Sequence, residues 1–308
     1  MLTASRHIDS ASTISDPTGG RGLRCWCGRN DWIVCFRAPR FGVLRCPGCG
    51  TYRTDPPPLN TASESEEFYT GYYQSVGTDA RPVEDPATSR SAGFWKVADQ
   101  APVLQVVRRS VADIGCGDGH FCAELQGRGW PSVTGVDISH SRVARARKLY
   151  PSVRFHDGTL RDAGVARGSL DLIVMEAVIE HLPDPVGFLE EVKASLVPGG
   201  LLVMTTPNMD SGHFRFLGKR WTGMLAPHAH IFLFSPLSIA RLVERAGLRT
   251  YQTGSYHTPI YTLVEYAKRL GRGDVKGTIW RAHQEIGGLY GRLINSGPML
   301  YVVAEKIA

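Results

Sequence analysis

The sequence contains little that would place it in or across a membrane. No stretch of its 308 residues approaches the roughly 18 consecutive apolar residues of a membrane-spanning helix. The first residues, Met1 to His7, lack the apolar core of a secretory signal. Internal repeats and long low-complexity segments are also absent. These absences predict a cytoplasmic chain.

Positive charge is in modest excess. The net charge is +6, and residues 1–60 hold eight arginines against four aspartates, with no lysine or glutamate. This surplus permits a polyanionic partner without requiring one, so a nucleic acid stays an alternative partner. The chain is 43% hydrophobic and 21% charged, which suffices for one large core and a small appendage.

A glycine-rich turn follows the short apolar stretch Val111–Ile114. Its glycines stand at every second position from Gly115 to Gly119, where they permit positive φ and the close approach of a ligand. A dinucleotide-binding turn would read GxGxxG and would bind a pyrophosphate. Here the pattern is GxGxG, with Asp113 before it and Asp118 inside it. Two carboxylates favour a cationic ligand over a pyrophosphate.

Apolar runs alternate with helical patterns after this turn. Short apolar runs predict strands, and the periodic segments between them predict helices. The predicted strands cover residues 111–114, 133–137, 153–158, 170–175 and 201–206, and the predicted helices cover 121–129, 139–149 and 188–196. A further helix is expected at 237–246, and two closing strands at 248–251 and 300–306. This order predicts a parallel sheet that is covered by helices on both faces.

Three segments together resemble the class I S-adenosylmethionine-dependent methyltransferases. They are the glycine turn, Asp137 twenty residues after Gly117, and the run EAVIEHLPDP at 176–185, which is similar to the EHLxDP segment of that family. The resemblance implies an α/β, Rossmann-like sheet of seven mostly parallel strands with the last strand reversed, and S-adenosylmethionine as cofactor. It assigns the ribose hydroxyls to Asp137 and the adenine amine to Asp157. The other cofactor-binding residues that it implies are Asp113, Gly115, Cys116, Gly117, Ile138, Gly158 and Glu176.

Five of the seven cysteines lie close together near the start of the chain. Four of them form two pairs, Cys25 with Cys27 and Cys46 with Cys49, and glycine follows each pair. In a reducing compartment such pairs favour a metal over a disulfide, and four thiolates suit a structural zinc. The first pair is one residue shorter than the usual CxxC, so Cys35 is an alternative ligand. A metal-free module with buried thiols is the other alternative.

Composition and pattern divide the chain into four parts. Apolar runs at 32–36 and 41–45 predict a hairpin between the cysteine pairs. The predicted parts are a flexible tail at 1–22, a zinc-ribbon-like module at 23–55, a linker and N-terminal helical lid at 56–109, and a methyltransferase domain at 110–308 with insertions at 207–235 and 257–298. Within the third part, a helix is expected from Ser91 to Arg109, broken or kinked at Pro102.

The two insertions are expected to form the walls and lid of an acceptor pocket, because methyl transfer benefits from the exclusion of water. Trp221, Phe232, Tyr256 and Tyr261 would give these walls flat apolar surfaces. The alternative for the second insertion is an interface between two copies of the chain.

By the same resemblance, the turn after the fourth strand faces the transferred methyl group. His181 is therefore the first candidate for a general base, followed by His230 and His228, since an imidazole pKa of about 6.5 suits proton removal from a phenol or an acidic enol.

The whole chain resembles zinc-ribbon-bearing class I methyltransferases of natural-product, deoxysugar and cell-surface polysaccharide pathways. Sugar C-methyltransferases of that group carry a further carboxy-terminal domain, for which 308 residues leave no room. Transfer of a methyl group to an O or N atom of a small-molecule acceptor is therefore expected. The alternatives are an RNA base methyltransferase and a non-catalytic regulator that binds S-adenosylmethionine.

Overall fold

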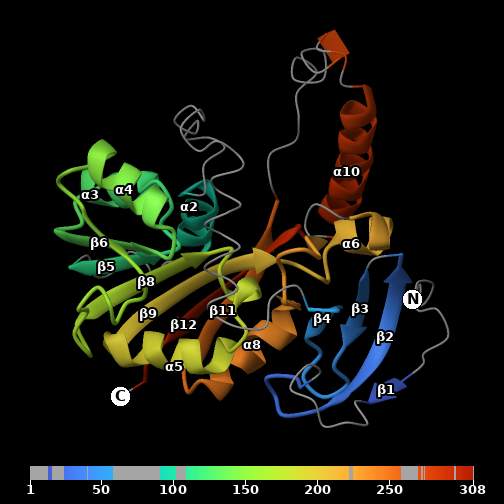
Figure 1. The fold of residues 1–308 in the computed structure, drawn as a ribbon, viewed down its shortest axis with the longest axis horizontal. Coiled ribbons are helices and arrows are strands. Elements are labelled where there is room, and N and C mark those ends of the chain that lie inside the picture. Colours follow the sequence, from blue (N-terminus) through green and yellow to red (C-terminus); the bar gives the residue numbers. More distant parts are fainter. Residues whose placement is uncertain are drawn as a thin grey trace.

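The computed structural model describes most of the chain and contains two sheets (Figure 1). The described residues are 13–15, 24–39, 41–57, 91–101, 109–221, 225–257, 270–271, 273, 275–294 and 296–307. A seven-stranded sheet has the order β11-β12-β9-β8-β5-β6-β7, and a five-stranded sheet has the order β1-β2-β3-β4-β10.

The larger sheet is mostly parallel, as predicted. Its strands are β5 (Ser110–Ile114), β6 (Ser132–Asp137), β7 (Arg154–Asp157), β8 (Leu170–Glu176), β9 (Leu196–Pro207), β11 (Arg249–Tyr256) and β12 (Met299–Glu305). The pairs among β5 to β9 are parallel, whereas β12 runs antiparallel to both β9 and β11. The last strand is therefore reversed, and the carboxyl ends of the other six strands share one edge.

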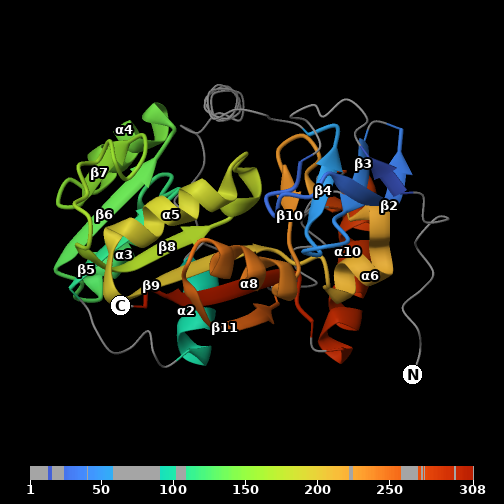
Figure 2. The same cartoon turned by 90° about the horizontal axis from the view of Figure 1, so that it is seen from below.

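Helices cover both faces of this sheet (Figure 2). Helices α2 (Ser91–Gln100), α3 (His120–Gly127) and α4 (His140–Leu149) lie over one face, and α5 (Pro185–Ser195) and α8 (Pro236–Arg245) lie over the other. Strand β8 shows why both faces need cover: its alternate side chains Ile173 and Met175 join one buried cluster, and Leu172 and Val174 join the other. A strand that is apolar on both faces belongs inside such a sandwich.

The smaller sheet extends beyond the predicted hairpin at both ends. Strands β2 (Asp31–Ala38), β3 (Phe41–Arg45) and β4 (Tyr52–Asp55) form its centre. The prediction of a tail at 1–22 was wrong for Thr13–Ser15, which form β1 and pair with β2. At the other edge, β4 pairs with β10 (Phe232–Leu233), which comes from the predicted methyltransferase domain. The boundary at residue 110 therefore does not separate two sheets.

The span 207–235 joins the two sheets and buries three of its aromatic side chains, Trp221, Phe232 and Phe234. Trp221 is only 2% exposed and packs with Phe36 and Val43 of the smaller sheet. Phe232 is buried as well. The prediction that Trp221 and Phe232 form pocket walls was wrong, because the apolar surface of the smaller sheet covers them.

Two more helices follow β9. Helix α6 (Gly212–Leu217) packs against α10 (Val275–Leu293), which lies in the second insertion. The apolar side chains Ile279, Ile286, Leu289 and Leu293 of α10 are exposed. Helix α2 ends at Gln100, two residues before Pro102, where a break was expected, and residues 102–108 lie outside the described residues. Tyr261 lies outside the described residues, and no described helix has the length and hydropathy needed to cross a membrane.

We expect Gly135→Ala to lower the free energy of unfolding by about 1–3 kcal/mol, the usual cost of overpacking a core. A Cβ atom at Gly135 of β6 would lie 2.5 Å from Phe155 Cδ1 and 2.9 Å from Cys116 Sγ. Gly127→Ala is the matched control, because nothing described lies within 4 Å of its Cβ position. Chemical denaturation measures the free energy of unfolding of both variants. Equal values for the two variants would contradict this packing around Gly135.

Candidate active site

The glycine turn between β5 and α3 is held by the end of β6. Gly115, Gly117 and Gly119 all have positive φ, between +56° and +81°. The Asp137 carboxylate accepts the backbone N–H of Gly117 through Oδ2 at 2.9 Å and the backbone N–H of Ser139 through Oδ1 at 2.8 Å. Asp137 is buried. A single carboxylate thus fixes the backbone of two turns.

Asp137 retains the capacity to bind a ligand. A carboxylate has about four acceptor positions, and the two backbone bonds use one on each oxygen. The buried group can therefore accept two more hydrogen bonds, such as those of a ribose diol. Ser139 stands at the N-cap position of α4, but its side chain does not form a capping hydrogen bond.

Asp157 lies next to Asp137 at the same edge of the sheet, because the two residues pair in register between β6 and β7. Its Oδ2 is 2.7 Å from His140 Nδ1, and its Oδ1 accepts from Arg147 at 3.1 Å. The hydrogen bond with His140, with a smaller contribution from Arg147, lowers the pKa of Asp157 to about 2. Gly158 follows with a φ of +115° and donates its N–H to the Asp137 backbone carbonyl.

The remaining predicted cofactor residues surround this edge. Asp113 is buried and accepts a weak bond from the thiol of Cys122 at 3.6 Å. Cys116 is buried within the glycine turn, and Ile138 is 38% exposed after β6. Glu176 is the last residue of β8, the neighbour of β5. The structure thus brings together every residue that the resemblance assigned to the cofactor.

A tight turn after β8 places a buried acid and a histidine beside the glycine turn. Ala177 has a φ of +53°, which is rare for a residue with a side chain. The 3-10 helix η4 (Ile179–His181) follows. A Cβ atom at Gly115 would lie 2.7 Å from Val178 Cγ2, so the two turns are in contact. Glu180 is fully buried.

His181 and His230 lie against each other, with ring centroids 4.7 Å apart and ring planes at 60°. His181 Nδ1 is 3.1 Å from the carbonyl oxygen of Ala229, which assigns the proton to Nδ1 and the lone pair to Nε2. His230 Nε2 is 3.9 Å from Glu180 Oε1. Two of the three predicted base candidates therefore meet, whereas His228 is exposed.

The smaller sheet supports this cluster through backbone hydrogen bonds. The Thr54 N–H donates to the Ile231 carbonyl at 3.2 Å, and the Ile231 N–H donates to the Glu180 carbonyl at 2.9 Å. Ile231 directly follows His230. The sheet that carries the cysteine pairs therefore fixes the segment that carries His230.

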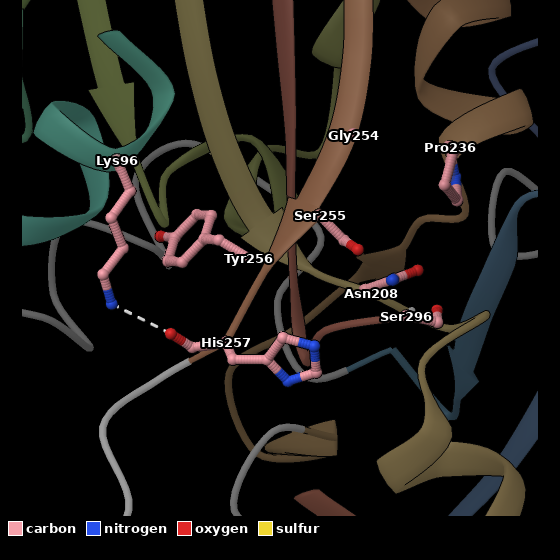
Figure 3. A pocket seen from close by; sticks show the side chains of 8 residues that line it. All are labelled: Lys96, Asn208, Pro236, Gly254, Ser255, Tyr256, His257 and Ser296. Atoms are coloured by element: carbon pink, nitrogen blue, oxygen red, sulfur yellow. Dashed lines mark hydrogen bonds between the residues drawn. The ribbon is translucent and has the colours of Figure 1, made fainter. Parts of the chain in front are cut away.

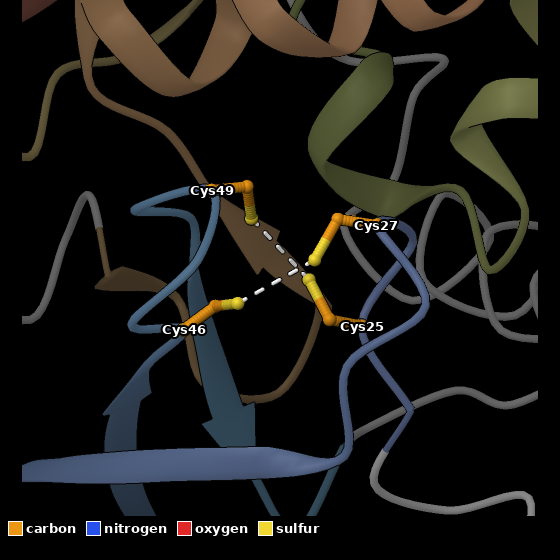
Figure 4. Close-up of side chains that lie close together, drawn as sticks. All are labelled: Cys25, Cys27, Cys46 and Cys49. Atoms are coloured by element: carbon orange, nitrogen blue, oxygen red, sulfur yellow. Dashed lines mark hydrogen bonds between the residues drawn. The ribbon is translucent and has the colours of Figure 1, made fainter.

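The four paired cysteines converge at the opposite end of that sheet (Figure 4). The Sγ atoms of Cys25 and Cys49 are 3.4 Å apart, and those of Cys27 and Cys46 are 3.6 Å apart. Arg241 of α8 donates to the carbonyl of Gly48 at 2.9 Å and so links this cluster to the larger domain.

Cys35 does not belong to the cluster. It lies on β2, packs in the apolar cluster that also contains Trp221, and points its thiol toward the carbonyl of Ile33. Burial raises the pKa of Cys35 to about 11, which keeps the group a thiol. The structure therefore gives no support to Cys35 as a substitute ligand.

A cavity of about 670 Å³ opens where β9 and β11 end (Figure 3). Its described lining consists of Lys96, Asn208, Pro236, Gly254, Ser255, Tyr256, His257 and Ser296. Gly93 contacts both Tyr256 and Glu176, since a Cβ there would lie 2.5 Å from Tyr256 Oη and 2.8 Å from Glu176 Oε1. The cavity therefore adjoins the end of β8.

Tyr256 was predicted as a wall residue, and the two predicted insertions, 207–235 and 257–298, contain Asn208, His257 and Ser296 of this lining. Lys96 comes from α2 and Ser296 from the segment before β12, so no local pattern could connect them. Asn208 did carry a signal, because it directly follows the end of β9 at the edge where ligands bind in such sheets.

Comparison with known proteins identifies the class of protein to which the chain belongs. A family described as a methyltransferase domain matches residues 94–253, just over half of the chain. A protein of Mycolicibacterium smegmatis with the name "Probable S-adenosylmethionine-dependent methyltransferase" is 31% identical over 56% of this chain and 65% of its own length. A ubiquinone biosynthesis O-methyltransferase of Thiobacillus denitrificans is 29% identical over 49% of this chain and 70% of its own.

A trans-aconitate 2-methyltransferase of Escherichia coli is 36% identical over 64% of this chain and 86% of its own length. The crystal structure of an S-adenosylmethionine-dependent methyltransferase from Mesorhizobium loti covers 70% of this chain and all of that one, with a TM-score of 0.50 at 17% identity, which supports the fold. The chain therefore belongs to the methyltransferase domain family and is an S-adenosylmethionine-dependent methyltransferase.

Proposed function

We propose that this methyltransferase transfers the methyl group to an O or N atom of a small-molecule acceptor. The observation that carries the proposal is the shared edge: the glycine turn, the His181–His230 pair and the cavity all lie where the parallel strands end. The names of two similar proteins, an O-methyltransferase and a trans-aconitate methyltransferase, agree with a small acceptor.

The residues of this edge fit the cofactor. When bound, S-adenosylmethionine supplies an electrophilic methyl group on a sulfonium. Asp137 would accept the ribose hydroxyls, and Asp157 with Ile138 and Gly158 would border the adenine. The glycine turn would border the amino-acid part of the cofactor, together with the carboxylates of Asp113 and Glu176.

Held by these residues, S-adenosylmethionine would supply its methyl group to the acceptor atom, with S-adenosylhomocysteine as the product. Where the acceptor carries a proton, we propose that His181 accepts it on Nε2. The Nδ1 contact with the Ala229 carbonyl holds the ring in the tautomer that this step needs. A carboxylate oxygen of the buried Glu180 lies within 4.8 Å of a ring nitrogen of His181, and its negative charge would favour the protonated imidazole.

His181→Asn should lower kcat by about 10²–10⁴-fold, the usual contribution of a general base, and remove the kcat dependence on a group that titrates near neutral pH. His228→Asn is the control, because His228 is exposed. The measurement is radiolabelled methyl transfer from S-adenosylmethionine into fractionated host extract. An unchanged pH profile in His181→Asn would reduce His181 to a structural role.

Asp137→Ala should weaken S-adenosylmethionine binding by about 10- to 100-fold, because two hydrogen bonds to a charged acceptor are lost. Asp171→Ala is a matched control: Asp171 also accepts a backbone N–H, that of Ser110, but at the opposite edge of the sheet. Calorimetry on the folded variants should separate the two. Equal affinities would contradict the assignment of Asp137.

We also propose that the four clustered cysteines hold one structural zinc. Four thiolates at about 2.3 Å from a tetrahedral zinc lie about 3.8 Å apart, close to the two separations seen here. Such an ion would stabilise the smaller sheet and, through it, the backbone of Ile231.

Protein purified without chelator should contain about one zinc per chain. Cys46→Ser and Cys49→Ser should lose the metal, whereas Cys35→Ser should retain it, because Cys35 lies outside the cluster. Elemental analysis measures the zinc content of each protein, and thermal unfolding shows whether each protein is folded. A fully folded wild-type protein without metal would end this proposal.

The smaller sheet offers little support for RNA as acceptor. Arg29 and Arg37 are paired with Asp31 and Asp55, and Arg53 is buried against the ring of Trp32. These arginines are therefore poorly placed to contact phosphates. The labelling experiment also tests the alternative of a non-catalytic regulator, which would bind the cofactor but release no S-adenosylhomocysteine with any fraction.

A further inference from the structure

The cavity at the end of β11 carries positive charge and hydrogen-bond donors. Its described lining includes one lysine and one histidine, and none of the described lining residues is acidic. Lys96 is half-buried, and its Nζ uses one proton to bond the His257 carbonyl at 2.9 Å. The same Nζ lies 5.7 Å from the centroid of the Tyr256 ring. Two of its protons are therefore left for other acceptors.

The other polar lining groups differ in what they can offer a ligand. Asn208 is engaged on both sides of its amide, by the Gly297 carbonyl and the Asp210 N–H. Ser296 donates to the Asp210 carbonyl. Ser255, in contrast, accepts the Gly297 N–H at 3.0 Å, which leaves its O–H as a donor. The cavity thus presents Lys96, Ser255 and the His257 ring.

Arg292, which is not among the described lining residues, adds positive charge near Lys96 and His257. Burial, and then the charge of Arg292, lowers the pKa of Lys96, and burial with the charges of Arg292 and Lys96 lowers the pKa of His257. Lys96 and Arg292 therefore repel each other, whereas the His257 ring, whose pKa is lowered from its ordinary value, is neutral near pH 7 and can donate one N–H. An anion near Lys96 would offset the repulsion between Lys96 and Arg292.

The acidic group that borders the cavity is already engaged elsewhere. Glu176 contacts Tyr256 from the side of Gly93, and burial together with the charge of Glu176 raises the pKa of Tyr256. Tyr256 therefore keeps its proton, and its hydroxyl lies close to the Glu176 carboxylate.

We propose that this cavity binds an anionic oxygen group of the acceptor, a carboxylate or a phosphate, through Lys96, the His257 ring and the Ser255 hydroxyl. This inference rests on the proposed function, because it names the chemical class of the small-molecule acceptor. The anionic group would anchor the acceptor at β11, while Tyr256 and Glu176 separate that anchor from the cofactor edge.

The test uses the full-length enzyme, radiolabelled S-adenosylmethionine and the small-molecule fraction of a host extract. Labelled products are passed over an anion-exchange resin at neutral pH. We expect most of the label to be retained, and Lys96→Met to reduce the retained label about tenfold or more, the effect of losing one charged hydrogen bond. Phosphatase treatment of the retained material then distinguishes phosphates, which lose retention, from carboxylates, which do not.

Two control variants separate charge from structure. Lys96→Arg keeps the charge and should restore most of the retained label, whereas Lys148→Met removes an exposed lysine of α4 and should change little. Binding of S-adenosylhomocysteine, measured by calorimetry, should be the same in all four proteins, which shows that Lys96→Met folds.

The outcomes distinguish this inference from the proposed function. Label in neutral molecules, equal in wild type and Lys96→Met, would overturn the anion site while leaving the methyltransferase assignment intact. A loss of label in Lys96→Arg as large as in Lys96→Met would also overturn it, because charge would then not matter. Cofactor binding without label in any fraction would overturn the proposed function itself.

Discussion

The hydrogen bonds that Asp137 accepts are the constraint on which the cofactor edge depends. Glycines at positive φ have no side chains to hold them, so the turn after β5 needs an external tether. Asp137 provides it at Gly117, and β6 adds bonds from Gly115 and Cys116 to the Val136 carbonyl. Val178 then packs on Gly115, so the turn that bears Glu180 and His181 takes its position from the glycine turn. One buried carboxylate thus sets the geometry of two neighbouring loops.

Local sequence patterns were sufficient to predict much of the cofactor edge. The strands β5, β6, β8 and β9 contain apolar runs that are buried on both faces, whereas the edge strand β7 buries only Phe155. The order of these strands along the chain dictates a parallel sheet. The glycine turn, Asp137 and the EHLxDP-like segment each follow a strand, so the shared edge brings them together. The four clustered cysteines were likewise found from spacing alone, because each pair lies in its own tight turn.

Contacts between distant segments were not predictable. Thr13–Ser15 is too short and too polar to indicate a strand until β2 is present beside it. Phe232 was expected in a pocket wall, because no local pattern indicates that its segment pairs with β4. Lys96 and His257 meet across the fold from segments without any motif. Burial of Trp221 has the same cause, since the surface that covers it comes from the first part of the chain.

The pairing of β4 with β10 has a consequence for the order in which the molecule can form. During synthesis, the amino-terminal strands leave the ribosome long before Phe232 is added to the chain. The edge of β4 therefore stays unpaired while most strands of the larger sheet are synthesised. Such a late, long-range closure costs loop entropy and exposes an unpaired strand edge in the meantime. The nascent chain therefore has a period of vulnerability to aggregation that ends only when β10 has been synthesised and can pair with β4.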